Sequence, residues 1–173
     1  MLALPLPDAS ADIVVSGLVL NFVPDRALAL AEMRRLLRPD GTLAFYVWDY
    51  PGGGVSFIRA FWVAAVALDA AAAPMTEAGR YAFCTSDGLT QLVRAAGFRD
   101  VEVTAVEDFA RFRDFDDFWR PFTVGAGAAQ VYCAGLSDAA RDQLRHRLEA
   151  QLPAAADGSI TLPLRAWAVH ARA

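Results

Sequence analysis

The chain has 173 residues, a net charge of −4, a hydrophobic content of 55% and a mean hydropathy of +0.29. This length suits one domain with a sizeable core, and the negative charge argues against nucleic acid as the main ligand. All 16 basic residues are arginines, which excludes catalysis through a lysine base or a lysine Schiff base. The high apolar content indicates either a large core or an apolar surface that a partner covers.

The sequence predicts a cytoplasmic protein without a membrane span. The apolar charge-free run at residues 60–68 has nine residues, whereas a span needs about 20. The first residues carry no positive charge and soon reach Pro5 and Asp8, so no signal peptide is expected. Cys84 and Cys133 lack the spacing of a metal or redox motif and are expected as buried thiols.

The first 50 residues predict a strand, a helix and a second strand. Residues 12–20 form an almost unbroken aliphatic run, which is typical of a strand buried on both faces. Asp25 is placed to cap a helix with one apolar stripe, and residues 39–41 are expected to stop it. Residues 42–48 form a second apolar strand, so the segment reads as a βαβ unit with parallel strands.

The rest of the chain predicts further helices and strands. Helices are expected over residues 56–73, after a cap at Ser86 and after a cap at Ser137. Strands are expected near residues 101–105 and over residues 160–170.

The order of these elements and the motifs between them resemble a class I S-adenosylmethionine (SAM)-dependent methyltransferase, of the ubiquinone/menaquinone-biosynthesis type or a related small-molecule type. The resemblance is carried by LPLPD at residues 4–8 before DIVV, by LNFVPD at 20–25, by EMRRLLRPDG at 32–41 and by LTQLVRAAGF at 89–98. Asp40 stands where the family usually has the first of two glycines, a mild departure because Asp tolerates turn conformations. The alternative, a nicotinamide-dependent oxidoreductase, would need its own glycine-rich turn.

The resemblance implies an α/β, Rossmann-like methyltransferase fold, with a largely parallel sheet and helices on both faces. Residues 1–107 would form the core, 108–158 an aromatic and helical insertion over the acceptor site, and 159–173 the last strand. In the family, the first strand and its glycine-rich cofactor turn precede the LPFPD-type segment by tens of residues. The N-terminal strands are therefore expected to be missing and the SAM site to be incomplete. Residues 52–54, a triple glycine, are expected as a loop.

A missing neighbour would leave residues 13–20 as an apolar sheet edge, which is a hazard for strand pairing. If several hundred Å² of apolar area stayed exposed to water, the protein would lose roughly 5–10 kcal/mol of stabilisation from burial. Three explanations stay open. The true start of the protein lies upstream, or the chain is a truncated protein that dimerises through this edge, or a separate polypeptide supplies the missing half.

Four residues near the end of the first strand are cofactor-binding candidates through the resemblance. Ser16, Gly17 and Leu18 lie where the family's backbone passes the methionine part of SAM, and Asn21 would lie near the transferable methyl group. The alternatives are a kink at a strand end for Gly17 and a turn-stabilising side chain for Asn21.

The end of the second strand supplies candidates for the acceptor side. Asp49 is a weak candidate for a base or for orienting a substrate hydroxyl, and the alternative is a cap or a solvated loop residue. Trp48 and Tyr50 flank it and could wall an apolar acceptor pocket. Phe118 belongs to the aromatic insertion, either as a lid over the acceptor or as ordinary core. Neither histidine is predicted to bind a metal.

These observations predict SAM-dependent methyl transfer, by descent, to a small apolar or aromatic acceptor, with this chain alone expected to be inactive. The alternative is a non-catalytic interaction module built from half of the fold, which forms a homodimer through residues 13–20. Neither hypothesis includes nucleic acid or a membrane span.

Overall fold

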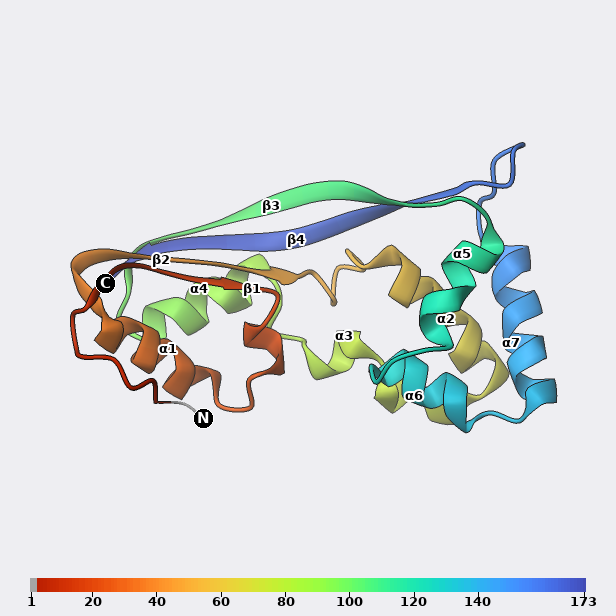
Figure 1. Cartoon of the computed structure of the whole chain (residues 1–173), viewed down its shortest axis with the longest axis horizontal. Coiled ribbons are helices and arrows are strands. Elements are labelled where there is room, and N and C mark those ends of the chain that lie inside the picture. Colours follow the sequence, from red (N-terminus) through yellow and green to blue (C-terminus); the bar gives the residue numbers. More distant parts are fainter. Residues whose placement is uncertain (1–2) are drawn as a thin grey trace. The chain divides into compact units, whose positions relative to one another are not determined.

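Figure 1 shows a computed structural model of the chain, in which residues 3–173 are described. The chain forms two compact units, each assembled from segments that are far apart in the sequence. The first unit contains Met1–Gly52, Tyr81–Val106 and Arg165–Ala173, and the second contains Gly53–Arg80 and Glu107–Leu164.

The strands form one four-stranded sheet in the order β1-β2-β4-β3. Their bounds are β1 Ala11–Gly17, β2 Leu37–Trp48, β3 Arg99–Phe112 and β4 Ile160–Arg172. The predicted parallel pairing of the first two strands is confirmed, with Ser16 opposite Phe45.

The prediction of a largely parallel sheet is wrong. Strand β4 runs antiparallel to β2, with Phe45 opposite Val169, whereas β1 pairs with β2 in parallel. The direction of a strand depends on the end of the sheet at which the chain re-enters. Strand β4 follows a turn in which Gly158 has a φ of 85°. No periodicity in the sequence encodes at which end of the sheet this turn places the chain.

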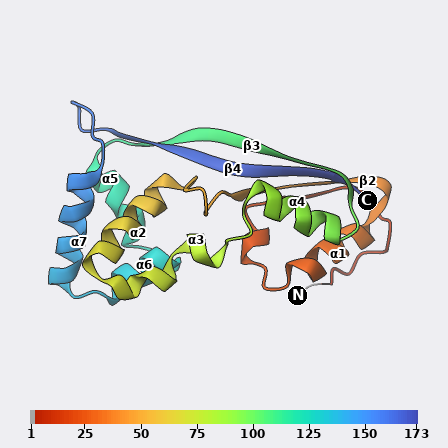
Figure 2. The same cartoon turned by 180° about the vertical axis from the view of Figure 1, so that it is seen from behind.

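Helices α1 (Arg26–Leu36) and α4 (Ser86–Ala95) of the first unit lie on the same face of the sheet (Figures 1 and 2). Within the part of this unit that the structure describes, the opposite face carries no helix, so the expectation of helices on both faces is not met there. An uncovered face explains why Val15 of β1 is 74% exposed.

The helix caps follow the sequence closely. Asp25 caps α1 as predicted, because its carboxylate accepts a hydrogen bond from the backbone N of Leu28 at 2.9 Å. Helix α4 is capped one residue earlier than predicted, by Thr85 and not by Ser86. Thr85 has the extended backbone of a cap, and its hydroxyl accepts from the backbone N of Gly88 at 3.0 Å.

The second unit is helical. Its elements are α2 (Ser56–Leu68), η2 (Ala70–Met75), α3 (Glu77–Arg80), α5 (Phe115–Trp119), η3 (Arg120–Phe122), α6 (Ala128–Gly135) and α7 (Asp138–Gln151). The predicted helix over residues 56–73 stops at Leu68, because Asp69 caps the next turn through the backbone N of Ala71. Ser137 caps α7 as predicted.

Aromatic side chains form the core of the second unit. Phe61 of α2 and Phe122 of η3 are buried and stack with ring centroids 4.6 Å apart. Phe115, Phe118 and Trp119 of the aromatic insertion belong to the same core. Among residues 3–173, no helix is both long enough and apolar enough to cross a membrane.

A buried carboxyl group joins α2 to α3 inside the second unit. Glu77 accepts a hydrogen bond from the indole Nε1 of Trp62, and burial raises the pKa of Glu77 above its ordinary value of 4.5. The folded protein therefore holds this proton more tightly than the unfolded chain does. The contribution of Glu77 to stability is fully present below pH 4.5 and is lost as the pH rises through the pKa of the folded state.

We predict that the variant Glu77→Gln removes this dependence on pH. Glutamine keeps an oxygen for the indole of Trp62 but carries no charge at any pH. The free energy of unfolding of the variant, relative to that of the native chain, should increase between pH 4.5 and pH 8. Urea unfolding at several pH values measures it, and a difference that stays constant would contradict the prediction.

Candidate functional site

The carboxyl end of β1 turns sharply. The strand was predicted to continue to residue 20, but it ends at Gly17, and a 3₁₀ turn, η1 (Leu20–Phe22), follows. Leu18 causes the change, because its φ of 56° lies in the left-handed region while its backbone N donates to the carbonyl of Tyr46 at 2.9 Å. This conformation costs a side chain such as leucine roughly 1–2 kcal/mol, and such strain is common at functional sites.

Gly17 lies against the ring of Tyr46. A Cβ added at Gly17 would lie 2.9 Å from the hydroxyl oxygen of Tyr46, which is closer than real Cβ atoms approach other heavy atoms. The contact with Tyr46 favours glycine here, which is a packing reason that differs from both the cofactor approach and the strand-end kink considered from the sequence.

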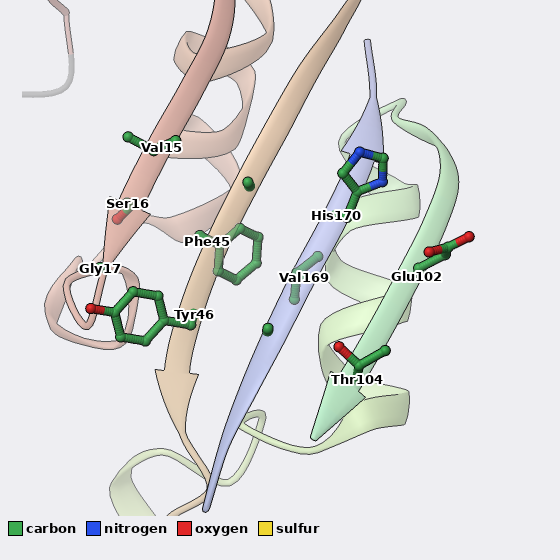
Figure 3. A pocket seen from close by; sticks show the side chains of 11 residues that line it. Val15, Ser16, Gly17, Phe45, Tyr46, Glu102, Thr104, Val169 and His170 are labelled. Atoms are coloured by element: carbon green, nitrogen blue, oxygen red, sulfur yellow. The ribbon is translucent and has the colours of Figure 1, made fainter. Parts of the chain in front are cut away.

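A hollow of about 560 Å³ lies over the uncovered face of the sheet (Figure 3). Ser16 and Gly17 line it from β1, Tyr46 lines it from β2, and Glu102 and His170 line it from β3 and β4. We call this feature the open-face hollow. Two of the predicted cofactor-binding residues, Ser16 and Gly17, therefore line this hollow.

Asn21, in the turn after β1, has a buried amide. The residue is 2% exposed, and neither Nδ2 nor Oδ1 has a hydrogen-bond partner among the described residues. The same holds for the indole Nε1 of Trp167 on β4. A buried polar group without a partner costs about 1–3 kcal/mol, so the Asn21 amide is suited to a polar ligand that both accepts and donates hydrogen bonds.

Asp49, directly after β2, is held in an ion pair with Arg165. Its Oδ2 accepts from Nε and Nη2 of Arg165 at 2.6 and 2.5 Å, and its Oδ1 accepts from the backbone N of Gly52 at 2.8 Å. Asp49 is 2% exposed, and its own backbone N donates to the carbonyl of Arg165 at 3.1 Å. We call this arrangement of Asp49, Arg165 and Gly52 the carboxylate clamp.

The residues beside Asp49 differ in their surroundings. Trp48 is half-buried and lies opposite Ala166 of β4. Tyr50 is buried, and its ring centroid lies 4.9 Å from that of Tyr81. The ring of Tyr81 in turn meets the edge of Phe22, with centroids 5.7 Å apart. Tyr50, Tyr81 and Phe22 form a continuous group that we call the aromatic row.

Sequence reasoning did not select Phe22 or Tyr81. Phe22 stood inside a motif that was used only for recognition, and Tyr81 lies in a segment without periodic pattern. Arg26 extends the neighbourhood, because its guanidinium lies 4.1 Å from the ring centroid of Phe83. Cys84 is buried here as predicted, and burial raises the pKa of its thiol to about 12, so it is not a nucleophile at neutral pH.

Phe118 lies in the second unit. It is fully buried, with its ring 5.2 Å from Phe112 and 5.4 Å from Phe122. Within that unit it is a core side chain. Among the described residues, no three side chains of His, Cys, Asp or Glu are grouped so that they could hold a metal ion.

We predict that Gly52→Ala destabilises the protein, whereas Gly135→Ala does not. A Cβ at Gly52 would overlap the carboxylate of Asp49 and the guanidinium of Arg165, and overpacking of this kind costs about 1–3 kcal/mol. Gly135 ends α6 with no heavy atom near its added Cβ, so alanine should be neutral or stabilise by up to about 1 kcal/mol. Urea unfolding of both variants tests this, and equal effects would contradict the clamp geometry.

Comparisons with known proteins agree with this fold. Residues 1–45 match the family described as a methyltransferase domain. The chain is 32% identical over 160 residues to the malonyl-[acyl-carrier protein] O-methyltransferase of Geobacter sulfurreducens, covering 90% of this chain and 57% of that protein. It is 31% identical over 114 residues to an uncharacterised protein of Mycobacterium tuberculosis, covering 62% of this chain and 42% of that protein.

The chain thus spans about half the length of these relatives. Among solved structures, a protein of Bacillus halodurans assigned as a methyltransferase superposes with a TM-score of 0.55 at 14% identity. That superposition covers 99% of this chain and 73% of the other, and at this identity it speaks for the fold alone.

Proposed function

Because the chain resembles class I SAM-dependent methyltransferases in sequence and in fold, we propose that it takes part in methyl transfer from SAM to a small apolar or aromatic acceptor. SAM supplies an electrophilic methyl group on a sulfonium centre. The protein then has to align the acceptor with that methyl group and exclude water. Ligands of open α/β sheets bind outside the carboxyl ends of the strands, where the residues of this site gather.

The buried amide of Asn21 is the observation that carries this proposal. Ser16, Gly17 and Leu18 precede it at the end of β1, and the strained backbone at Leu18 directs the chain into the turn that contains it. An amide with a free donor and a free acceptor fits a zwitterionic amino-acid moiety such as the methionine part of SAM. We assign these four residues to the cofactor side.

On the acceptor side, we assign Trp48 and Tyr50, which lie at the carboxyl end of β2. Phe118 we assign to the core of the second unit, because it is enclosed there by other aromatic rings.

The complete cofactor site, in this proposal, includes a segment that pairs with β1. Strand β1 is at one edge of the sheet, and its Ile13 and Val15 side chains are 62% and 74% exposed. The greater length of the relatives is consistent with such a segment.

We predict that Asn21→Leu has opposite effects on stability and on cofactor affinity. Leucine removes an amide that has no partner, so the free protein should be equally stable or more stable. If the amide binds the cofactor, affinity for SAM should fall about tenfold to a hundredfold, the equivalent of about 1–3 kcal/mol. Calorimetric titration with SAM and thermal unfolding without it measure the two effects.

Gln143→Leu is the matched control, since Gln143 is exposed on α7 and should affect neither quantity. Unchanged SAM affinity in Asn21→Leu would remove Asn21 from the cofactor site. No binding of millimolar SAM to the native chain would show that this chain does not form the site alone, and would favour the second candidate function.

The second candidate is a non-catalytic interaction module that forms a homodimer through β1. The exposed edge favours it, because unpaired backbone groups beside exposed apolar side chains are a template for pairing with another strand. Asp12 of β1 carries a negative charge, but its Oδ1 lies 2.6 Å from Nη1 of Arg38 in the same chain. This ion pair reduces the repulsion that the charge would exert on a second strand.

We predict for this candidate that Val15→Lys abolishes dimers, because a lysine at an edge strand is costly to bury. Val63→Lys, at a comparably exposed position of α2 in the second unit, is the control and should not change the mass. Sedimentation velocity between 5 and 100 µM, chosen to bracket a dissociation constant on the order of micromolar, measures the oligomeric state. A native chain that stays monomeric throughout would exclude the homodimer.

A further inference from the structure

The carboxylate of Asp49 is occupied mainly by partners from its own chain. Both oxygens are engaged, Oδ2 with two nitrogens of Arg165 and Oδ1 with the backbone N of Gly52. The side chain is 2% exposed, so little of it is accessible. A general base must come within hydrogen-bond distance of the proton that it removes, and this carboxylate is enclosed by its own partners.

Arg165 is itself fixed from two sides. Its guanidinium lies 5.4 Å from the ring centroid of Trp167 on the same strand, and its carbonyl accepts from the backbone N of Asp49. The side chain and the backbone of Arg165 thus both hold the residue that follows β2. Gly52 completes the enclosure, because any side chain there would overlap the ion pair.

The clamp fixes the segment that carries Tyr50. Tyr50 directly follows Asp49, and two residues farther along Gly52 donates to the same carboxylate. The Tyr50 ring packs on Tyr81, and Tyr81 packs on Phe22, whose ring is 62% exposed. Movement of the turn after β2 would therefore displace the whole aromatic row.

We propose that Asp49 and Arg165 are positioning residues that hold the aromatic row in place, and that Asp49 does not act as an acid or base. The row consists of three rings from the segments after β1, after β2 and before α4, and it ends in the exposed face of Phe22. The three aromatic rings can bind a planar or apolar group of a ligand through stacking and apolar contact. The placement of the aromatic row beside the acceptor rests on the proposed function. The effect of the carboxylate clamp on the position of the row does not depend on that function.

Fluorine NMR of the chain labelled with 3-fluorotyrosine tests the clamp directly. The four tyrosines, Tyr46, Tyr50, Tyr81 and Tyr132, give four resonances that single Tyr→Phe variants assign. Asp49→Asn and Arg165→Met should both shift or broaden the resonances of Tyr50 and Tyr81. Tyr132 belongs to the second unit and should keep its resonance.

Thermal unfolding gives a second readout. Arg165→Met leaves a buried charge without its partner and should lower Tm by about 5–10 °C. The double variant Asp49→Asn/Arg165→Met removes that charge and should recover part of the loss. Arg113→Met is the control, because Arg113 is exposed and the loss of its ion pair with Asp117 should change Tm by less than about 2 °C. Should Arg165→Met fail to fold, Asp49→Asn, which is close to isosteric, carries the NMR test alone.

The two proposals fail in different ways. If Tyr50 and Tyr81 keep their resonances in Asp49→Asn and in any Arg165→Met that folds, the clamp does not position the row and the inference is overturned. If both resonances shift but the native chain binds no SAM, the clamp stands, whereas this chain does not form the cofactor site alone and the second candidate function is favoured. A methyl-transfer rate abolished by Asp49→Asn with all tyrosine resonances in place would instead identify Asp49 as a base.

Discussion

A charged carboxylate that is removed from water sets the local order of the first unit. Asp49 is stable in the interior only while each of its oxygens has a donor, and the structure meets this condition with Arg165 and the backbone of Gly52. The requirement joins the end of β2 to β4, makes glycine necessary at position 52, and fixes the turn that carries Tyr50. The aromatic side chains at the carboxyl ends of the strands depend on this ion pair for their position.

Strand β1 is an edge strand, because β2 is its neighbour on one side and no strand of the described residues pairs with its other side. Strand β1 gains its hydrogen bonds from β2, while its other edge and the open-face hollow present apolar side chains. Apolar surface of this kind is favoured only when another element covers it. The strained backbone at Leu18 and the unpaired amide of Asn21 follow directly after this strand. Both features raise the free energy of the folded chain, and a ligand or another chain segment bound at this position would offset that cost.

The second unit is stabilised by its own core. Phe61, Phe118 and Phe122 bring together rings from α2, α5 and η3, and the hydrogen bond between Trp62 and Glu77 joins α2 to α3. The buried members of this core all belong to residues 53–80 and 107–164.

The sequence by itself determined the features whose causes are local. The βαβ segment and the caps at Asp25 and Ser137 follow from residues that interact within a few positions or from the period of the apolar side chains. Only the tertiary structure decided the antiparallel direction of β4, the pairing of Asp49 with a residue 116 positions away, the contact of Tyr81 with Tyr50, and the burial of Phe118 in a different core from that of Tyr50. These features depend on which distant segments meet in space, and a pattern along one stretch of chain does not contain that information.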